Sequence, residues 1–308
     1  MIASAARLRA DGPVRAATPR AATPRAATPR RATPRRATPR PTTPRPATSV
    51  AASVAIRDVL LGPPRPARVV AAFPAAVYLA HDDGVVALVT TDGIRHPNAL
   101  VLPDPTARGA LGAHRVHQPG TVGNGEVVVA GHRVSVARWF DPTPRLPTTD
   151  RRQLRAALEL GRRHLERVTG PLPTGLTEGA AEVAGALADG DVEDAVAAAR
   201  GLVGLGPGLT PAGDDVLAGL LSATLLLSLA VDGAGAGSAD ALLGRLPDTT
   251  RSAGTAIAAH ARGATTSISA ALLAHGARGE VAAPAATVLH ALTGRGSLPR
   301  AIDVLLSV

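Results

Sequence analysis

Twelve residues at 204–215, GLGPGLTPAGDD, bring together residue types that can bind small polar ligands. Glycines at every second position let a loop adopt positive φ and approach its neighbours closely; they are Gly204, Gly206 and Gly208. Thr210 adds a hydroxyl, and Asp214 and Asp215 add two carboxylates in front of an almost unbroken apolar run. The pattern predicts a tight loop entering a buried helix, with Thr210 as its N-cap and both aspartates in its first turns.

This stretch is compatible with three roles. Free N–H groups at a helix start bind anions, but two carboxylates would repel a phosphate unless a divalent cation lay between them. In that role Mg²⁺ is the expected cofactor, with Asp214, Asp215 and the Thr210 hydroxyl as its oxygen ligands. Alternatively, Asp214 or Asp215 is catalytic, as a base or as the acceptor of a hydrogen bond from a substrate amide. The third role is purely structural, a capped helix after a tight loop.

The motif lies in a part of the chain with helical periodicity. After the break DPTPRLP at 141–147, the expected helices cover 148–168, 177–188, 191–201, 211–231, 238–246, 250–262, 264–276, 279–293 and 298–307. Between 67 and 140, Val-rich segments alternate with turn signals, which favours a largely antiparallel sheet of about five to seven strands. We therefore expect an α+β protein, in which a β-rich region at 50–147 packs on an α-helical region at 148–308 that carries the motif.

The composition excludes several classes of site. The chain has 308 residues, of which 45% are hydrophobic and only 1% aromatic, so its core must be built from Ala, Val and Leu. Cysteine is absent, which excludes disulfides, thiolate zinc sites and cysteine nucleophiles. Lysine is absent too, which excludes a Walker-type phosphate lysine, a Schiff-base lysine and a Ser–Lys dyad.

The basic character of the chain is confined to its N-terminal end. Residues 1–49 hold eleven arginines and one acid, a net charge of +10, whereas the remaining 22 arginines and 23 acids leave the body at −1. Thr-Pro-Arg recurs every five residues between 18 and 45, and so many prolines predict an extended, disordered tail. The neutral body lacks a basic patch with stacking aromatics, so we expect no nucleic-acid partner.

The most apolar run, 217–231, is short for a membrane span and has two aspartates at its head. We interpret it as a buried central helix. The Arg-Arg pairs of the tail are not followed by an apolar segment, so no export signal is recognisable. The expectation is a soluble, cytoplasmic protein that does not bind membranes.

Three segments resemble a known bacterial family. GLGPGLTPAGDDVLAGLL at 204–221 is similar to the signature of a family first catalogued as a domain of unknown function and later associated with oxamate carbamoyltransferase, as its AllH-type subunit. The second segment, RGATTSISAALLAHGARGE at 262–280, resembles a block that lies downstream in the same family. The third, AAFPAAVYLAHDDGVVALVTTDG at 71–93, resembles the family more weakly. The resemblance spans 50–295 and leaves out the tail.

The resemblance implies a carbamoyltransferase subunit that acts in purine and allantoin nitrogen catabolism. A small anionic substrate such as carbamoyl phosphate or oxamate would bind at the GLGPGLTPAGDD loop, and other subunits of a transferase complex would be its partners. Carbamoyl transfer needs an anion clamp, for which a hydroxyl-rich helix start with a nearby arginine is suitable. The expected substrate-binding residues are Gly206, Gly208, Thr210, Gly213, Arg262, Thr265, Thr266 and Ser269. The alternative is a non-catalytic binding or assembly partner of an acyl- or carbamoyl-transferring complex.

Overall fold

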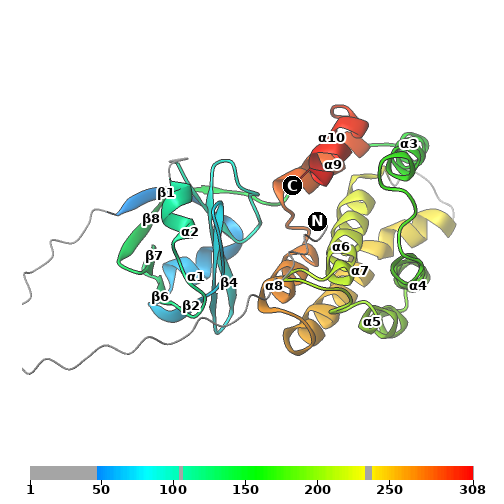
Figure 1. Ribbon diagram of the computed structural model, residues 1–308. Helices are drawn as coiled ribbons and strands as arrows, with labels where there is room; N and C mark the ends of the chain where they lie inside the picture. The colour runs from blue at the N-terminus through cyan, green and yellow to red at the C-terminus, as the bar shows by residue number, and fades with distance from the viewer. Residues whose placement is uncertain (1–46, 104–106, 233–237, 308) are drawn as a thin grey trace, which may run out of the picture. The chain divides into compact units, whose positions relative to one another are not determined.

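The described part of the protein comprises residues 47–103, 107–232 and 238–307 of a computed structural model. Its strands all precede residue 141 and its long helices all follow residue 150 (Figure 1), so the predicted α+β class is confirmed. The predicted disordered tail at 1–49 falls outside the described residues as far as residue 46. Thr48 and Ser49, its last two residues, belong to the first strand.

Eight strands within the described residues close into a barrel. In barrel order they are β1 (Thr48–Ser53), β5 (Ala99–Leu102), β4 (Gly84–Thr90), β3 (Ala76–His81), β2 (Arg65–Phe73), β6 (Pro119–Gly123), β7 (Glu126–Val129) and β8 (His132–Phe140). Six neighbouring pairs are antiparallel, as predicted for most of the sheet, whereas β1–β8 and β4–β5 are parallel.

The prediction of about five to seven strands is wrong, because the sequence pattern does not reveal three short strands, β1, β5 and β6. β1, β5 and β6 have only six, four and five residues. A period of two is hardly recognisable over so few positions, and β6 also contains Pro119 and two glycines. Pairing with longer neighbours, rather than local preference, places these segments in the sheet.

The barrel interior is apolar because inward positions alternate with outward ones along its strands. Val69 and Leu79 belong to one buried interior cluster together with Val86 and Leu88. β4 is buried along nearly its whole length, because its Val85 packs outside the barrel against the helical half. Short helices fill the connections: a 3-10 turn (Val54–Ile56), α1 (Arg57–Leu61) and α2 (Ala107–Gly112).

The helical half contains eight helices among the described residues. They are α3 (Arg151–Thr169), α4 (Thr174–Asp189), α5 (Val192–Arg200), α6 (Ala212–Ala230), α7 (Ser238–Ala264), α8 (Ser267–Gly276), α9 (Ala283–Leu292) and α10 (Leu298–Leu306). The two helices expected at 238–246 and 250–262 are one helix, α7, which continues through Pro247. A proline removes one helical N–H donor, and packing of the flanking turns overrides that local cost.

α6 is the central helix of this half. Its Leu217 and Leu221 share a buried cluster with Ile257 of α7 and Leu273 of α8. Within the described ranges, α6 is the one helix long and apolar enough to cross a membrane by length and composition. Its inner leucines lie in the protein core, which is typical of a core helix in a globular domain.

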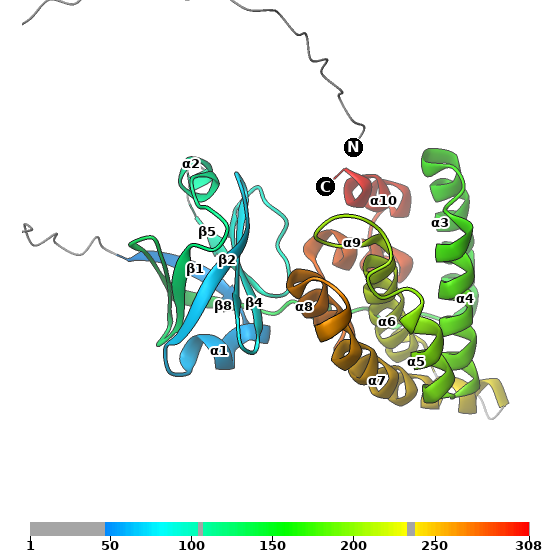
Figure 2. The same cartoon turned by 60° about the horizontal axis from the view of Figure 1, so that its bottom comes forward.

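α8 connects the helical half to the barrel. Its Ile268 lies in a buried cluster with Ala71 of β2 and Val85 of β4. α8 also packs on both α6 and α7 (Figure 2). Only Thr265 and Thr266 separate the end of α7 from the start of α8, and the Thr265 hydroxyl is bonded to Asp214 in the first turn of α6.

Candidate functional site

The glycine-rich loop between α5 and α6 is held by contacts that exclude larger residues. Its three alternating glycines have positive φ, as predicted: Gly204 (74°), Gly206 (115°) and Gly208 (101°). A Cβ on Gly204 would lie 2.7 Å from the carbonyl oxygen of Ala264, and one on Gly213 would lie 2.0 Å from that of Leu202. The loop therefore packs directly against the end of α7, and the first turn of α6 packs against the residues that follow α5.

Asp214 joins three segments of the chain. Its side chain is buried, with 2% of the residue exposed. Oδ1 accepts a hydrogen bond from the Gly204 N–H at 2.9 Å. Oδ2 accepts from the Thr265 hydroxyl at 2.5 Å and from the Ser269 hydroxyl at 2.7 Å. Three donors compensate for the lost hydration of a buried carboxylate, so Asp214 is a fixed point between the loop, α6 and α8.

Thr266, rather than Thr210, is the threonine that caps a helix. Its Oγ1 accepts a hydrogen bond from the Ser269 N–H at 3.1 Å at the start of α8. The same hydroxyl donates to the carbonyl oxygen of Leu209 at 2.5 Å, which ties α8 to the glycine-rich loop. The N-cap of α6 is Pro211, and no side chain caps it. The predicted capping role of Thr210 is therefore wrong.

Thr210 instead influences the second aspartate. Its side chain favours the ionised form of the Asp215 carboxylate and so acts to lower the pKa of Asp215. Partial desolvation and the nearby charge of Asp214 act in the opposite direction and raise the pKa of Asp215 to about 6. Asp215 is nevertheless exposed at the surface. A reachable carboxylate with a pKa close to neutrality is suited to accepting a proton.

The predicted Mg²⁺ site can be judged from the oxygen atoms available. The Asp214 carboxylate is already satisfied by three protein donors, so its charge needs no cation. No group of three or more His, Asp or Glu side chains that could hold a metal occurs among the described residues. Mg²⁺ binding stays a prediction, and the reachable ligands for it are Asp215 and Thr210, completed by water or substrate oxygens.

A cationic side chain lies on the same connection. Arg262 is exposed in the last turn of α7, three residues before Thr265. Its side chain makes no hydrogen bond or ion pair with any residue that the structure describes. Its guanidinium is therefore free to bind an anion from solution.

The start of α8 also has unused donors. The N–H groups of Ser267 and Ile268, in its first turn, have no hydrogen-bond partner among the described residues. The first turn of α6 differs, because the Gly213 N–H is bonded to the carbonyl oxygen of Leu205 at 2.9 Å. An anion would therefore find backbone donors at α8 rather than at α6.

The Asp214 side chain faces a buried contact rather than an open cleft. A hollow of about 320 Å³ is present on the barrel instead, where β2 and β3 meet. None of the predicted site residues lines it; its walls are Pro66, Ala67, Arg68, Ala80, His81 and Asp82. The polar cluster at the helix starts is thus a surface site with one buried anchor.

The polar residues at the starts of α6 and α8 lie inside a segment that matches a family model. Residues 202–308 match the family model described as oxamate carbamoyltransferase subunit AllH. The resemblance of 204–221 and 262–280 is confirmed, whereas that of 71–93 lies outside the match and stays a prediction; the match supports a carbamoyltransferase-associated subunit. It contains α6 to α10 and leaves out the barrel and α3 to α5. No curated protein and no solved structure matches the chain.

The structure brings together most of the predicted site residues and gives them different tasks. Thr265 and Ser269 bond the Asp214 carboxylate directly, and Thr266 bonds the loop. Two contacts escaped the sequence analysis, the Gly204 N–H and the Leu209 carbonyl, because main-chain groups leave no mark in the sequence. Substrate binding by Gly206, Gly208 and Gly213 stays a prediction.

Proposed function

We propose that the protein is a carbamoyltransferase subunit of the oxamate type, which binds a small anion at the starts of α6 and α8. The observation that carries the proposal is the buried Asp214 bridge, which links the two polar segments inside the matched region. A structural role alone needs only one cap at each helix. The bridge fixes a loop, two helix starts and an adjacent free carboxylate in one arrangement, as a transferase site requires.

The anion has suitable partners at one side of this arrangement. Carbamoyl phosphate and oxamate both carry negatively charged oxygens, and the free N–H groups of Ser267 and Ile268 are donors of the kind that bind such oxygens. Arg262 adds a flexible positive charge from the end of α7. In this proposal Thr266 holds the α8 start in shape, because it caps the helix and anchors the loop.

Asp215 would handle the proton of the reaction. In carbamoyl transfer, the acceptor nitrogen forms a bond to the carbamoyl carbon while the bond from that carbon to the phosphate oxygen breaks. Phosphate leaves with the electron pair, and the proton of the acceptor nitrogen must go to a base. With a pKa of about 6, Asp215 is mostly ionised at neutral pH and can accept it. Asp214 then acts as a positioning residue.

Pathway and cellular context follow from the same proposal. In this proposal the protein acts in purine and allantoin nitrogen catabolism, in the cytoplasm, with other transferase subunits as partners. If Mg²⁺ binds here, Asp215 and Thr210 would hold it, and it would supply positive charge that neutralises substrate oxygens. Neither nucleic acid nor membrane has a role in this function.

Ligand-dependent thermal stability of the full chain tests the proposal. We expect carbamoyl phosphate or oxamate to raise the melting temperature, and Mg²⁺ to increase the effect. Arg262→Gln and Asp215→Asn should abolish the ligand effect without lowering the ligand-free melting temperature, because both residues are exposed and the charge of Asp215 does not stabilise the fold. Arg200→Gln is the matched control, since Arg200 is likewise exposed at the end of a helix, α5. No stabilisation by either anion, or equal stabilisation of all the variants, would overturn the proposal.

A further inference from the structure

The hollow on the barrel is not used by the proposed function. Its volume of about 320 Å³ lies at the lower end of the range for small-molecule sites. Residues of β2, of the end of β3 and of the turn that follows β3 form its walls: Pro66, Ala67, Arg68, Ala80, His81 and Asp82. Two neighbouring strands of the barrel therefore build the whole hollow.

Pro66 explains why the sheet leaves room at this place. The pairing of β2 with β3 ends at Arg68 and Ala80, and the next pair in the same register would be Pro66 and Asp82. The N–H and the carbonyl of Val69 form hydrogen bonds on the side of β6, so the main chain of Pro66, three residues earlier, faces the opposite side, toward β3. Proline has no N–H with which to continue the pairing, so the pairing stops there.

His81 contributes a hydrogen-bond donor to the wall of the hollow. Its Nδ1 accepts a hydrogen bond from the Asp83 N–H at 3.2 Å, so in the neutral ring the proton lies on Nε2. Partial burial lowers the pKa of His81, the charge of Arg65 acts in the same direction, and the charge of Asp82 acts against both. The ring is therefore neutral at neutral pH, and its Nε2–H has no partner among the described residues.

Two opposite charges in the hollow are unpaired. Arg68 and Asp82 are both exposed, and the side chain of neither forms a hydrogen bond or an ion pair with a residue that the structure describes. Their neighbours Arg65 and Asp83 form an ion pair with each other. Neither neighbour is therefore available to neutralise Arg68 or Asp82.

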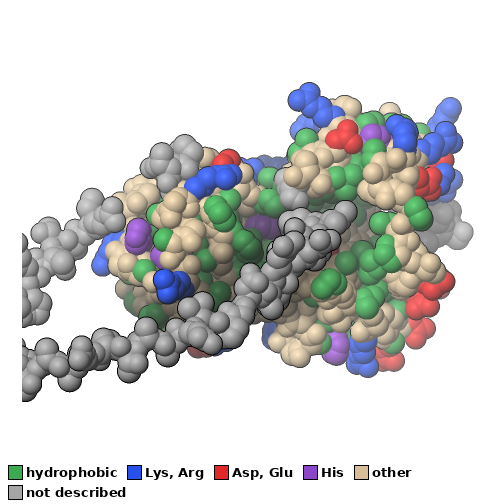
Figure 3. Space-filling model, in the orientation of Figure 1, with side chains coloured by type: hydrophobic (Ala, Val, Ile, Leu, Met, Phe, Trp, Pro, Cys, Tyr) green, Lys and Arg blue, Asp and Glu red, His purple; other side chains and the backbone are tan. Residues whose placement is uncertain are grey.

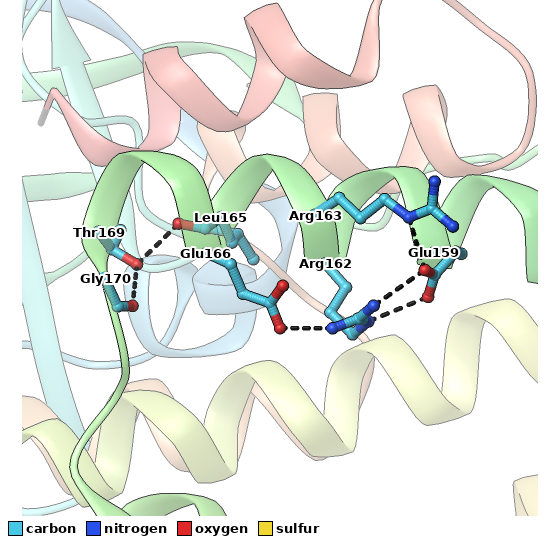
Figure 4. A network of polar contacts seen from close by, with 7 residues as sticks. All are labelled: Glu159, Arg162, Arg163, Leu165, Glu166, Thr169 and Gly170. Carbon is cyan, nitrogen blue, oxygen red and sulfur yellow. Dashed lines mark hydrogen bonds and ion pairs between the residues drawn. The ribbon is translucent and has the colours of Figure 1, made fainter.

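The charged surface of the helical half is different. There, acidic and basic side chains lie next to each other in the space-filling view (Figure 3). On α3, Arg162 Nη2 and Arg163 Nε lie 2.9 and 2.7 Å from Glu159 Oε1, and Arg162 also bonds Glu166 (Figure 4). The two charges in the hollow lack such partners and are available to a ligand.

We propose that this hollow binds a small aliphatic α-amino acid as a zwitterion. The carboxylate of the ligand binds the Arg68 guanidinium and the His81 Nε2–H, and its ammonium group binds the Asp82 carboxylate. A simple anion would be repelled by Asp82 and a simple cation by Arg68, so a ligand with both charges is the best complement. The remaining walls, a proline and two alanines, suit a short aliphatic side chain.

This proposal is independent of the proposed transferase function. The hollow lies on the barrel, outside residues 202–308, and shares no residue with the starts of α6 and α8. Failure of either proposal therefore leaves the other standing.

Isothermal titration calorimetry of the full chain with L-valine tests the proposal. We expect saturable binding of L-valine. N-acetyl-L-valine lacks the ammonium charge and L-valinamide lacks the carboxylate, so each should bind at least about tenfold more weakly. Arg68→Gln and Asp82→Asn should weaken L-valine binding to the same extent. Both residues are exposed and unpaired, so these variants should keep the wild-type melting temperature.

The matched control is Arg138→Gln, since Arg138 is likewise exposed on a barrel strand, β8, and has no partner among the described residues. It should bind L-valine like the wild type, and so should Arg262→Gln from the proposed anion site. Four results would overturn the proposal: no saturable binding of L-valine, equal binding of either analogue, wild-type affinity of Arg68→Gln or Asp82→Asn, or loss of L-valine binding in Arg262→Gln.

Discussion

Replacing Asp214 with asparagine should destabilise the protein far more than the same replacement one residue later. Asparagine keeps the shape of the side chain and removes its charge. At Asp214 that charge receives three hydrogen bonds in a buried place, whereas at Asp215 the carboxylate is exposed and Thr210 favours its ionised form. The pair is a matched comparison, because both aspartates lie in the first turn of α6.

The magnitude follows from the hydrogen bonds. A bond to a charged group contributes about 1.5–3 kcal/mol and a neutral one about 0.5–1.5 kcal/mol, so each bond loses about 1 kcal/mol when the charge is removed. Three bonds together lose about 3 kcal/mol. Part of this loss is offset, because a neutral asparagine costs less desolvation free energy to bury than a carboxylate. We expect Asp214→Asn to cost about 2–3 kcal/mol of unfolding free energy, and Asp215→Asn less than about 0.5 kcal/mol.

Urea unfolding followed by far-UV circular dichroism measures both values. In a thermal scan, the Asp214→Asn loss corresponds to a decrease of about 5–15 °C in melting temperature for a domain of this size. The slope of the urea transition should stay constant, since the surface exposed on unfolding does not change. Equal midpoints for the two variants would refute the reasoning, because they would mean that the three donors do not stabilise the Asp214 charge.

Three further predictions concern the same region. Gly213→Ala should cost at least about 3 kcal/mol of unfolding free energy, because the new Cβ would lie 2.0 Å from the Leu202 carbonyl oxygen. Gly208→Ala has no atom within 4 Å of the new Cβ, so it should cost only the strain of its positive φ, about 1–2 kcal/mol. Similar urea midpoints for the two variants would contradict this prediction. Thr265→Val removes one donor to Asp214 and should cost about 1–2 kcal/mol by the same assay, and an unchanged midpoint would show that this bond is not formed. The pKa of Asp215 is raised from 3.8 to about 6 in the folded protein, so ionisation of this carboxyl opposes folding. As the pH rises from 4 to 6, the wild type should therefore lose unfolding free energy relative to Asp215→Asn. A constant difference in unfolding free energy between the two proteins across this range would contradict the shift.

Much of the architecture could be predicted from the sequence, because it depends on local patterns. Helical periodicity predicted a helix at each helical segment of the second half, with α7 divided into two, and alternation predicted five of the eight strands, β2, β3, β4, β7 and β8. The closure of the barrel was not predictable in this way. It depends on parallel pairing of β1 with β8, whose residues lie far apart in the chain, and on β5, which has only four residues. Non-local pairing leaves no period in the sequence.

The residues of the candidate site were predictable, but the hydrogen bonds between them were not. Residue types indicated that 204–215 and 265–269 belong together, and the Asp214 bonds to Thr265 and Ser269 confirm their contact. Thr210 was assigned the cap of α6 because threonine before proline is a common helix start. The structure uses Pro211 at that position, and Thr210 instead favours the ionised form of Asp215.

The division of work between the two aspartates follows from helix geometry. Consecutive residues on a helix point about 100° apart, so two adjacent carboxylates cannot face the same neighbours. Once Gly213 packs against the Leu202 carbonyl, the first turn of α6 has one orientation, and that orientation buries Asp214 against Thr265 and Ser269. Asp215 is then directed outward, and the buried charge beside it helps to raise its pKa toward neutrality. The two adjacent aspartates, which the sequence suggests as a pair of metal ligands, are thus better explained by two different roles: Asp214 anchors the loop and α8, and its charge raises the pKa of Asp215. The comparison of Asp214→Asn with Asp215→Asn measures this difference.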